Sequence, residues 1–251
     1  MTTSAETTAA TPPAKPTPIW EDIPDIFFAP RAVFERRRGG RFGKMLLVLL
    51  LILSVLGAAS TWALAPAQAG DQSRMMSRMT QGNPEAAAAV QAAAARGPTV
   101  LSAVLGGLGT GFAMALAVFL VALAIWLLGI MFGASTSFGA GALIATYAYF
   151  PRILGQVAGI IQGLVMDPAN LDSMFRVTAS PARFFDPDTT SLIMLVLLSR
   201  FDLFVLWSTV LIGIGVYVIG RVSKAEAAGI ALLVWVLGAL PALGPAAIFG
   251  R

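Results

Sequence analysis

The apolar stretch at residues 189–221 constrains the fold more than any other feature, because Arg200 and Asp202 lie near its middle. As one helix it would extend about 50 Å, whereas the hydrocarbon core of a bilayer is only about 30 Å thick. Charged side chains at that depth are costly unless they are buried in protein or lie near the headgroups. We therefore predict a short apolar helix, a break between Ser199 and Asp202, and a membrane span at residues 203–220.

Composition extends this membrane assignment to the whole chain. Only 12% of the 251 residues are charged, whereas a soluble domain has about 25%, and the mean hydropathy is +0.79. The chain contains neither Cys nor His, which excludes thiolate nucleophiles, Cys/His metal sites and His-based proton relays. Because no clustered carboxylate pair is present either, we predict no enzymatic activity, no catalytic residue, no metal and no cofactor.

The remaining apolar segments predict an all-α helical bundle that crosses the bilayer five times. The expected spans are residues 45–64, 105–132, 138–165, 203–220 and 227–249. Seven of the 17 Lys and Arg residues precede residue 45, which predicts a cytoplasmic N-terminus and, after five spans, a C-terminus on the opposite side of the cell (cytoplasmic) membrane. Since topology explains this basic cluster, we predict the lipid bilayer as a partner and no nucleic acid.

The segment before the first span divides into two parts, followed by the membrane domain at residues 45–250. Residues 1–18 are rich in Thr, Ala and Pro, which predicts a disordered tail. Residues 19–44 interleave aromatic, acidic and basic side chains, which suits the cytoplasmic headgroup region of an anionic leaflet. The residues expected at the membrane surface are Trp20, Phe27, Phe28, Arg36, Arg37 and Arg38. A second hypothesis is that the acidic–aromatic part, residues 20–25, docks a cytosolic partner.

Five polar side chains are candidates for intramembrane polar or ion-pair sites: Arg152, Gln156, Gln162, Arg200 and Asp202. A lone charge in lipid is expensive, so each arginine should find a carboxylate. We expect Arg152 to pair with Asp202. By the same argument, we expect Arg200 to pair with Asp167.

Small residues and turn residues predict how the helices pack and where they bend. Glycines spaced four apart allow the backbones of neighbouring helices to approach closely in lipid. The helix-packing candidates are Gly107, Gly111, Gly155, Gly159 and Gly163. Pro151 should kink the third span, and Asn83 followed by Pro84 predicts the start of a short helix in the first outside loop.

Three segments of the chain are IFFAPRAVFERR at residues 26–37, TYAYFP at residues 146–151 and LLSRFDLFVLW at residues 197–207. In this order and spacing they resemble the Yip (Ypt-interacting protein) family in its bacterial form. The second segment contains Tyr147 and Pro151 of a Tyr-x-x-x-Pro signature, and the third contains Phe201 and Trp207. The resemblance implies a five-span membrane protein.

Eukaryotic members of that family bind small Rab-type GTPases through a cytosolic N-terminal region and act in vesicle traffic at Golgi and endoplasmic reticulum membranes. The resemblance therefore implies a Golgi or endoplasmic reticulum location if the chain is eukaryotic. The acidic Asp-Leu-Tyr-Gly-Pro motif of those relatives is missing here, which argues against small GTPase binding.

Two functions fit these observations. The first is a non-enzymatic membrane protein that organises or recruits partners, including other membrane proteins or copies of itself. The second is a transporter or channel for a small solute that uses Arg152, Arg200 and Asp202, because intramembrane charges mark functional sites by default. A water-filled cavity that reaches Asp202 would favour transport, and a dry, tightly packed bundle would favour the organiser.

Overall fold

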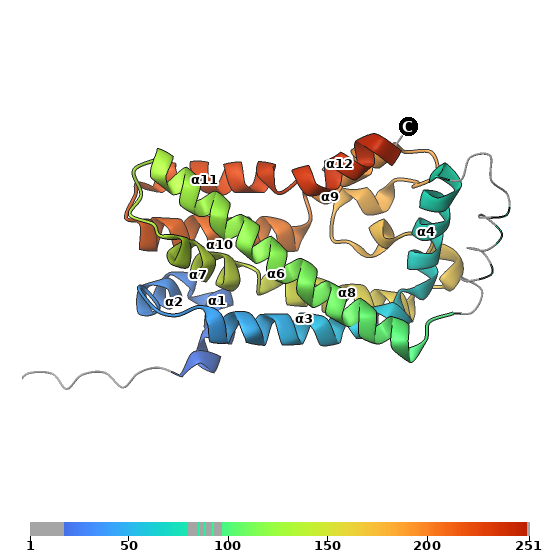
Figure 1. Ribbon diagram of the computed structural model, residues 1–251, viewed down its shortest axis with the longest axis horizontal. Coiled ribbons are helices and arrows are strands. Elements are labelled where there is room, and N and C mark those ends of the chain that lie inside the picture. Colours follow the sequence, from blue (N-terminus) through green and yellow to red (C-terminus); the bar gives the residue numbers. More distant parts are fainter. Residues whose placement is uncertain (1–17, 80–84, 86–87, 89–91, 93–96, 250–251) are drawn as a thin grey trace, which may run out of the picture.

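The computed structural model describes residues 18–79, 85, 88, 92 and 97–249, and within these ranges every regular element is a helix (Figure 1). The N-terminal half contains η1 (Ile19–Glu21), α1 (Asp22–Phe28), α2 (Pro30–Arg36), α3 (Gly43–Ala63), α4 (Ala65–Met79) and α6 (Val100–Met131). The C-terminal half contains α7 (Phe138–Ala148), α8 (Pro151–Val165), η2 (Pro168–Asn170), η3 (Met174–Val177), η4 (Pro181–Phe184), α9 (Leu192–Ser199), α10 (Leu203–Gly220), α11 (Lys224–Leu237) and α12 (Leu240–Phe249). The predicted tail, except for its last residue, and most of the helix expected after Asn83 lie outside the described residues.

Four segments of the described chain are long and apolar enough to cross a bilayer: Gly43–Ala63, Val100–Met131, Leu203–Gly220 and Lys224–Gly244. They confirm the predicted all-α membrane bundle, with one segment fewer than expected. The stretch predicted as the third span forms two shorter helices, α7 with 11 residues and α8 with 15. Pro151 opens α8, and because proline has no backbone N–H it cannot donate the hydrogen bond that would continue α7, so it ends one helix and begins another.

The fourth apolar stretch is broken where the sequence predicts. α9 ends at Ser199, and α10 begins at Leu203. One oxygen of the Asp202 carboxylate accepts hydrogen bonds from the backbone N–H groups of Phe204 and Val205 at 2.9 and 3.3 Å. These bonds satisfy N–H groups that the start of a helix leaves without a partner. The break therefore gives Asp202 a local structural role as the N-cap of α10.

Two other long helices begin at capping boxes, where side chain and backbone bond reciprocally. Thr99 and Ser102 form the box of α6, and Ser223 and Glu226 form that of α11. The backbone N–H of Ser223 donates to the Glu226 carboxylate at 2.8 Å. The backbone N–H of Glu226 in turn donates to the Ser223 hydroxyl at 3.2 Å, so the two residues close the first turn of α11.

The N-terminal helices α1 and α2 pack on the bundle at the end opposite α12 (Figure 1). Their side chains Ile26, Val33 and Phe34 are fully buried. The Phe34 ring lies edge-on to the ring of Tyr147 in α7, with 6.3 Å between the ring centres. The apolar side of this segment therefore contacts the protein core, where the sequence predicts contact with headgroups, because α7 and α10 offer closer packing than a fluid interface.

The six residues predicted at the membrane surface fall into two groups. Trp20 and Phe28 are 69% and 88% exposed, so contact with headgroups stays a prediction for them. The other four contact protein groups: Phe27, Arg36, Arg37 and Arg38. Arg38, for example, donates a hydrogen bond to the carbonyl oxygen of Val218 in α10.

The two predicted packing glycines of α6 lie against α3. A Cβ atom on Gly107 would lie 2.5 Å from the carbonyl oxygen of Ser54, and one on Gly111 would overlap the Ser54 hydroxyl. Separations below about 3 Å do not occur for real Cβ atoms in close-packed interiors. The backbones of α3 and α6 therefore approach each other at a distance that only glycine permits.

The three glycines of α8 do not share one neighbouring helix. A Cβ on Gly155 would meet the Phe204 ring of α10, whereas one on Gly163 would meet the Ala63 carbonyl oxygen at the end of α3. Gly159 lies between them, and a Cβ there would have no neighbour nearer than 4.0 Å. Gly155 and Gly163 therefore permit close contacts with two different helices, whereas Gly159 borders open space.

At the end of the bundle opposite α1 and α2, α4 runs across the long helices (Figure 1). Arg74 of α4 forms salt bridges with Asp188 at 2.7 Å, Asp172 at 3.3 Å and Asp71 at 3.4 Å. Asp172 also pairs with Arg176 at 3.0 Å. This ion-pair network joins α4 to the loop at residues 166–191, which contains η2, η3 and η4.

Replacing Arg74 with Gln should loosen α4 from this loop. The Arg74 side chain is only 19% exposed and contacts three carboxylates. We therefore expect the free energy of unfolding to fall by about 1–2 kcal/mol, more than the 0–1 kcal/mol that a surface ion pair typically contributes. Thermal unfolding of the purified protein in detergent measures the loss. Arg31→Gln is the control, because Arg31 forms a salt bridge with one carboxylate among the described residues, that of Glu35, and its side chain is 67% exposed. Equal effects of the two changes would contradict the prediction.

Candidate functional site

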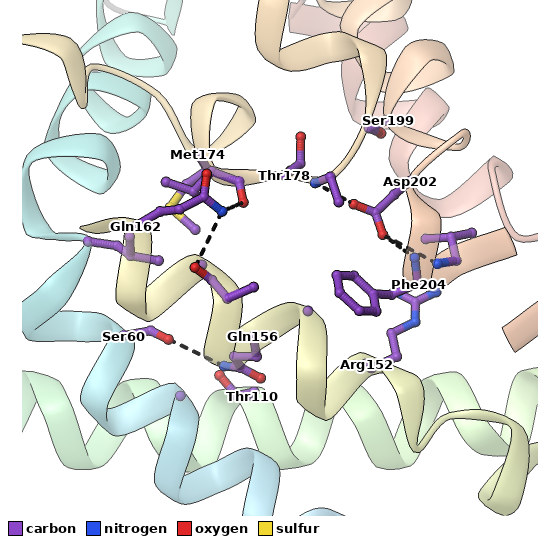
Figure 2. Close-up of a pocket in the computed structure, with 18 of the residues that line it drawn as sticks. Ser60, Thr110, Arg152, Gln156, Gln162, Met174, Thr178, Ser199, Asp202 and Phe204 are labelled. Carbon is purple, nitrogen blue, oxygen red and sulfur yellow. Dashed lines mark hydrogen bonds between the residues drawn. The ribbon is translucent and has the colours of Figure 1, made fainter. Parts of the chain in front are cut away.

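A cavity of about 610 Å³ lies among α3, α6, α8, η3 and the break between α9 and α10. It is lined by all five intramembrane polar residues that the sequence singles out: Arg152, Gln156, Gln162, Arg200 and Asp202. Figure 2 shows Arg152 and Asp202 on one side of the cavity and Gln162 on the other. The cavity borders three of the apolar segments that are long enough to cross a bilayer, with Ser60 near the end of α3, Gly106 near the start of α6 and Phe204 at the start of α10. Its volume is typical of sites for small organic ligands.

Arg152 enters the cavity from the first turn of α8 (Figure 2). Its guanidinium carbon lies 5.0 Å from the centre of the Tyr149 ring, a distance that allows a cation–π contact. Its Nε is buried and has no hydrogen-bond partner among the described residues. The Tyr149 ring therefore packs against the guanidinium group, while Nε has no hydrogen-bond partner among the described residues.

Asp202 does not form the expected ion pair with Arg152 in the described part of the chain. Its second oxygen accepts a hydrogen bond at 2.8 Å from the backbone N–H of Ala179, in addition to the two bonds that cap α10. Backbone donors therefore surround both oxygens of this carboxylate, and they replace the salt bridge that the sequence led us to expect. The predicted Arg152–Asp202 ion pair is therefore wrong, although both residues line the same cavity.

Arg200 is held by α11 rather than by Asp167, so the second expected ion pair is also not formed among the described residues. Its Nη2 donates to the Trp235 carbonyl oxygen, and the Trp235 indole N–H donates to the Arg200 carbonyl oxygen at 3.0 Å. The guanidinium carbon lies 5.5 Å from the centre of the Trp235 ring. Gly238 makes room for the side chain, since a Cβ there would lie 3.0 Å from Nη2. The Nε of Arg200 is buried and has no hydrogen-bond partner within the described ranges.

The two glutamines are fixed by neighbouring elements. Gln156 donates to the Ser60 hydroxyl at 3.4 Å, which links α8 to α3 (Figure 2). Gln162 donates to the Val177 carbonyl oxygen at 3.2 Å and accepts from Arg183 at 3.0 Å. Both amides are therefore oriented by the protein, whereas the two arginines keep buried nitrogen atoms without partners.

A second polar group, the Asp22 cluster, joins the N-terminal helices to the bundle and consists of Asp22, Arg36, Arg37 and Tyr147. The Asp22 side chain is fully buried. One of its oxygens accepts hydrogen bonds from Arg36 at 2.5 and 3.1 Å, and the other accepts from Arg37 Nε and the Tyr147 hydroxyl, both at 2.6 Å. A hydrogen bond to Asp25 at 2.9 Å raises the pKa of Arg36 above its usual value. The cluster is thus a charged anchor between α1, α2 and α7.

The three family-like segments meet at this anchor and beside it. Tyr147 of the second segment bonds Asp22 next to the first, and the Trp207 ring of the third lies 5.3 Å from that of Phe27 in the first. Phe201 packs at 5.3 Å on Trp235. Segments more than 100 residues apart in the chain therefore form one contact region.

Sequence reasoning did not identify Asp22, Trp235 or Gly238. Asp22 is a single acid in a stretch that also contains exposed acids, so its burial has no signal in spacing or hydropathy. Trp235 and Gly238 lie in an apolar span with no motif. Only the acid-then-arginine order of residues 22–37 hints at an ion pair, and many surface helices share that order.

Comparison with individual proteins gives no match, whereas comparison with protein families does. A search of curated proteins and of solved structures found no match to the chain. A model of the Yip1 domain matches residues 25–244, a range that includes the end of α1 from Asp25 on, all of α2, the cavity and all four apolar membrane segments. The chain therefore belongs to the Yip1 domain family.

Proposed function

We propose that this chain is a non-enzymatic membrane protein that organises or recruits partners at the membrane through α1 and α2. The observation that carries the proposal is the combination of a fixed platform with exposed aromatic side chains. Asp22 anchors the two helices inside the protein, whereas Trp20 and Phe28 remain 69% and 88% exposed. Large exposed aromatic residues on an ordered support are typical of binding surfaces.

Co-purification from membranes, with mass spectrometry of the captured proteins, tests this proposal. Trp20→Ala combined with Phe28→Ala should remove specific partners that wild-type protein retains. Phe184→Ala is the matched control, because Phe184 is 81% exposed but lies in η4 near the far end of the bundle. Loss of the same partners in the control, or retention of all partners in the double variant, would refute the assignment to α1 and α2.

We further propose that α1 and α2 face the cytoplasm, that α7 and α8 together make a fifth crossing, and that the C-terminus lies on the opposite side of the cell membrane, or of a Golgi or endoplasmic reticulum membrane in a eukaryote. The position of α12 at the end of the bundle opposite α1 and α2 supports this topology (Figure 1). The chain has no native Cys, so one introduced Cys reports without background. In sealed membranes of known orientation, a membrane-impermeant maleimide should label Phe184→Cys from the outside. Arg31→Cys should be labelled only after the membrane is opened; the reverse pattern would refute this topology.

A second candidate function, transport of a small solute, is favoured by the cavity that reaches Asp202. Transporter sites are often formed by interrupted helices, and the chain is interrupted between α7 and α8 and between α9 and α10. Impermeant thiol reagents should then label Ser199→Cys or Thr178→Cys in intact membranes. Complete protection of both positions would count against a water-accessible path.

A further inference from the structure

We propose that the cavity binds the phosphate group of a membrane lipid between Arg152 and Arg200. The inference goes beyond partner recruitment, and it requires no transport, because binding at the cavity is independent of both. It begins from a local imbalance of charge. Two guanidinium groups and one carboxylate line the cavity, and the carboxylate of Asp202 is occupied by three backbone N–H groups.

The two arginines each have a buried side-chain nitrogen that has no partner among the described residues. Neither forms a salt bridge with a carboxylate in the described part of the chain, and the Nε of each is buried without a hydrogen-bond partner. Arg152 also lies close enough to Arg200 for their like charges to interact. Both side chains are half-buried, and a charged group that is partly removed from water without a counter-charge is unfavourable, so two neighbouring ones indicate that an anion belongs between them.

The chemistry of the donors selects an oxyanion. A guanidinium group presents parallel N–H donors that match two oxygens of a phosphate, and arginine is preferred over lysine where this fork geometry matters. Two arginines that approach from α8 and from the α9–α10 break can each bind different oxygens of one phosphate. The rings of Tyr149 and Trp235 hold the guanidinium planes in place, so little side-chain freedom would be lost on binding.

The size and remaining lining of the cavity select a lipid over a free ion. A volume of about 610 Å³ is far larger than one phosphate needs and suits an organic molecule. Apolar side chains such as Met114, Val196 and Phe204 line the same space, and these suit a glycerol backbone or the start of an acyl chain. Gly159 of α8 contributes no side chain and keeps the space open.

Native mass spectrometry of the full-length protein, purified in a neutral detergent, tests this inference. The probes are phosphatidylglycerol and, in a separate arm, inorganic phosphate, each added at increasing concentration while the thermal midpoint is followed. Wild-type protein should retain one phosphatidylglycerol and gain thermal stability from it. Arg152→Gln should weaken this binding about tenfold to a hundredfold, because it removes a hydrogen-bonded charge.

Two further variants separate loss of binding from loss of folding. Gly159→Leu keeps both arginines but places a side chain in the cavity, where a Cβ has no neighbour nearer than 4.0 Å, and should also reduce lipid retention. Arg31→Gln changes an exposed arginine near α1 and should leave retention unchanged. Protection by inorganic phosphate equal to that by lipid would support the phosphate contact but overturn the lipid assignment. Absence of any effect from either probe, or retention unchanged in both cavity variants, would overturn the proposal.

Discussion

Asp22→Asn should detach α1 and α2 from the bundle. The Asp22 side chain is fully buried and accepts hydrogen bonds from Arg36, Arg37 and Tyr147. An amide in its place leaves two guanidinium groups without their buried counter-charge, and breaking a buried pair in this way costs about 3–5 kcal/mol. Trypsin should then cleave at the basic residues between 31 and 41 under conditions that leave wild-type protein intact, and the thermal midpoint in detergent should fall.

Asp25→Asn is the matched control for this change. Asp25 contacts the same Arg36, but its side chain is 41% exposed, so its loss should cost less than about 1 kcal/mol. Trypsin sensitivity of the control should stay close to that of wild-type protein. Equal sensitivity of the two variants would mean that the Asp22 cluster does not hold the N-terminal helices in place.

The second large effect is expected at the contact between α3 and α6, where Gly107→Ala should lower stability. The added methyl group would lie 2.5 Å from the carbonyl oxygen of Ser54, a backbone atom that moves only if the helices separate. Overpacking of this kind typically costs about 1–3 kcal/mol. Thermal unfolding and the yield of monodisperse protein in detergent measure the loss.

Gly109→Ala in the same helix provides the comparison. A Cβ on Gly109 has no neighbour within 4 Å, so the change adds helix propensity without a clash, and should stabilise by up to about 1 kcal/mol. A loss of stability at Gly107 and a gain at Gly109 would show that packing, not helix propensity, decides the effect. A fall in stability at both positions would refute this explanation.

Local chemistry made much of the bundle predictable. The start of α10 follows from Asp202, which is an N-cap residue placed before an apolar run, and the predicted and observed bounds of this span agree. The division of the third stretch follows from Pro151, which cannot continue a helix. Such signals act over a few residues, so they are legible in the chain itself.

The partners of the charged residues were not predictable in the same way. Asp202 and Arg152 are opposite charges at similar depth, and pairing them is the economical hypothesis from composition. In the structure the backbone N–H of Ala179 donates a hydrogen bond to Asp202, because the loop before η4 folds back over the start of α10. Whether a carboxylate meets an arginine or a backbone N–H depends on the path of a loop, which hydropathy does not encode.

The sequence by itself determined that this protein lives in a membrane and predicted the four segments that are apolar enough to cross it, together with a fifth that instead forms α7 and α8. It also placed the interruptions near Pro151 and Asp202, because hydrophobicity and backbone chemistry are properties of short segments. Only the tertiary structure decided that Asp22 meets Tyr147 across 125 positions, and that α8 leaves an open, positively charged space beside Gly159. Those outcomes depend on how whole helices pack, since burial and the pairing of charges are settled by neighbours that the order of residues does not name.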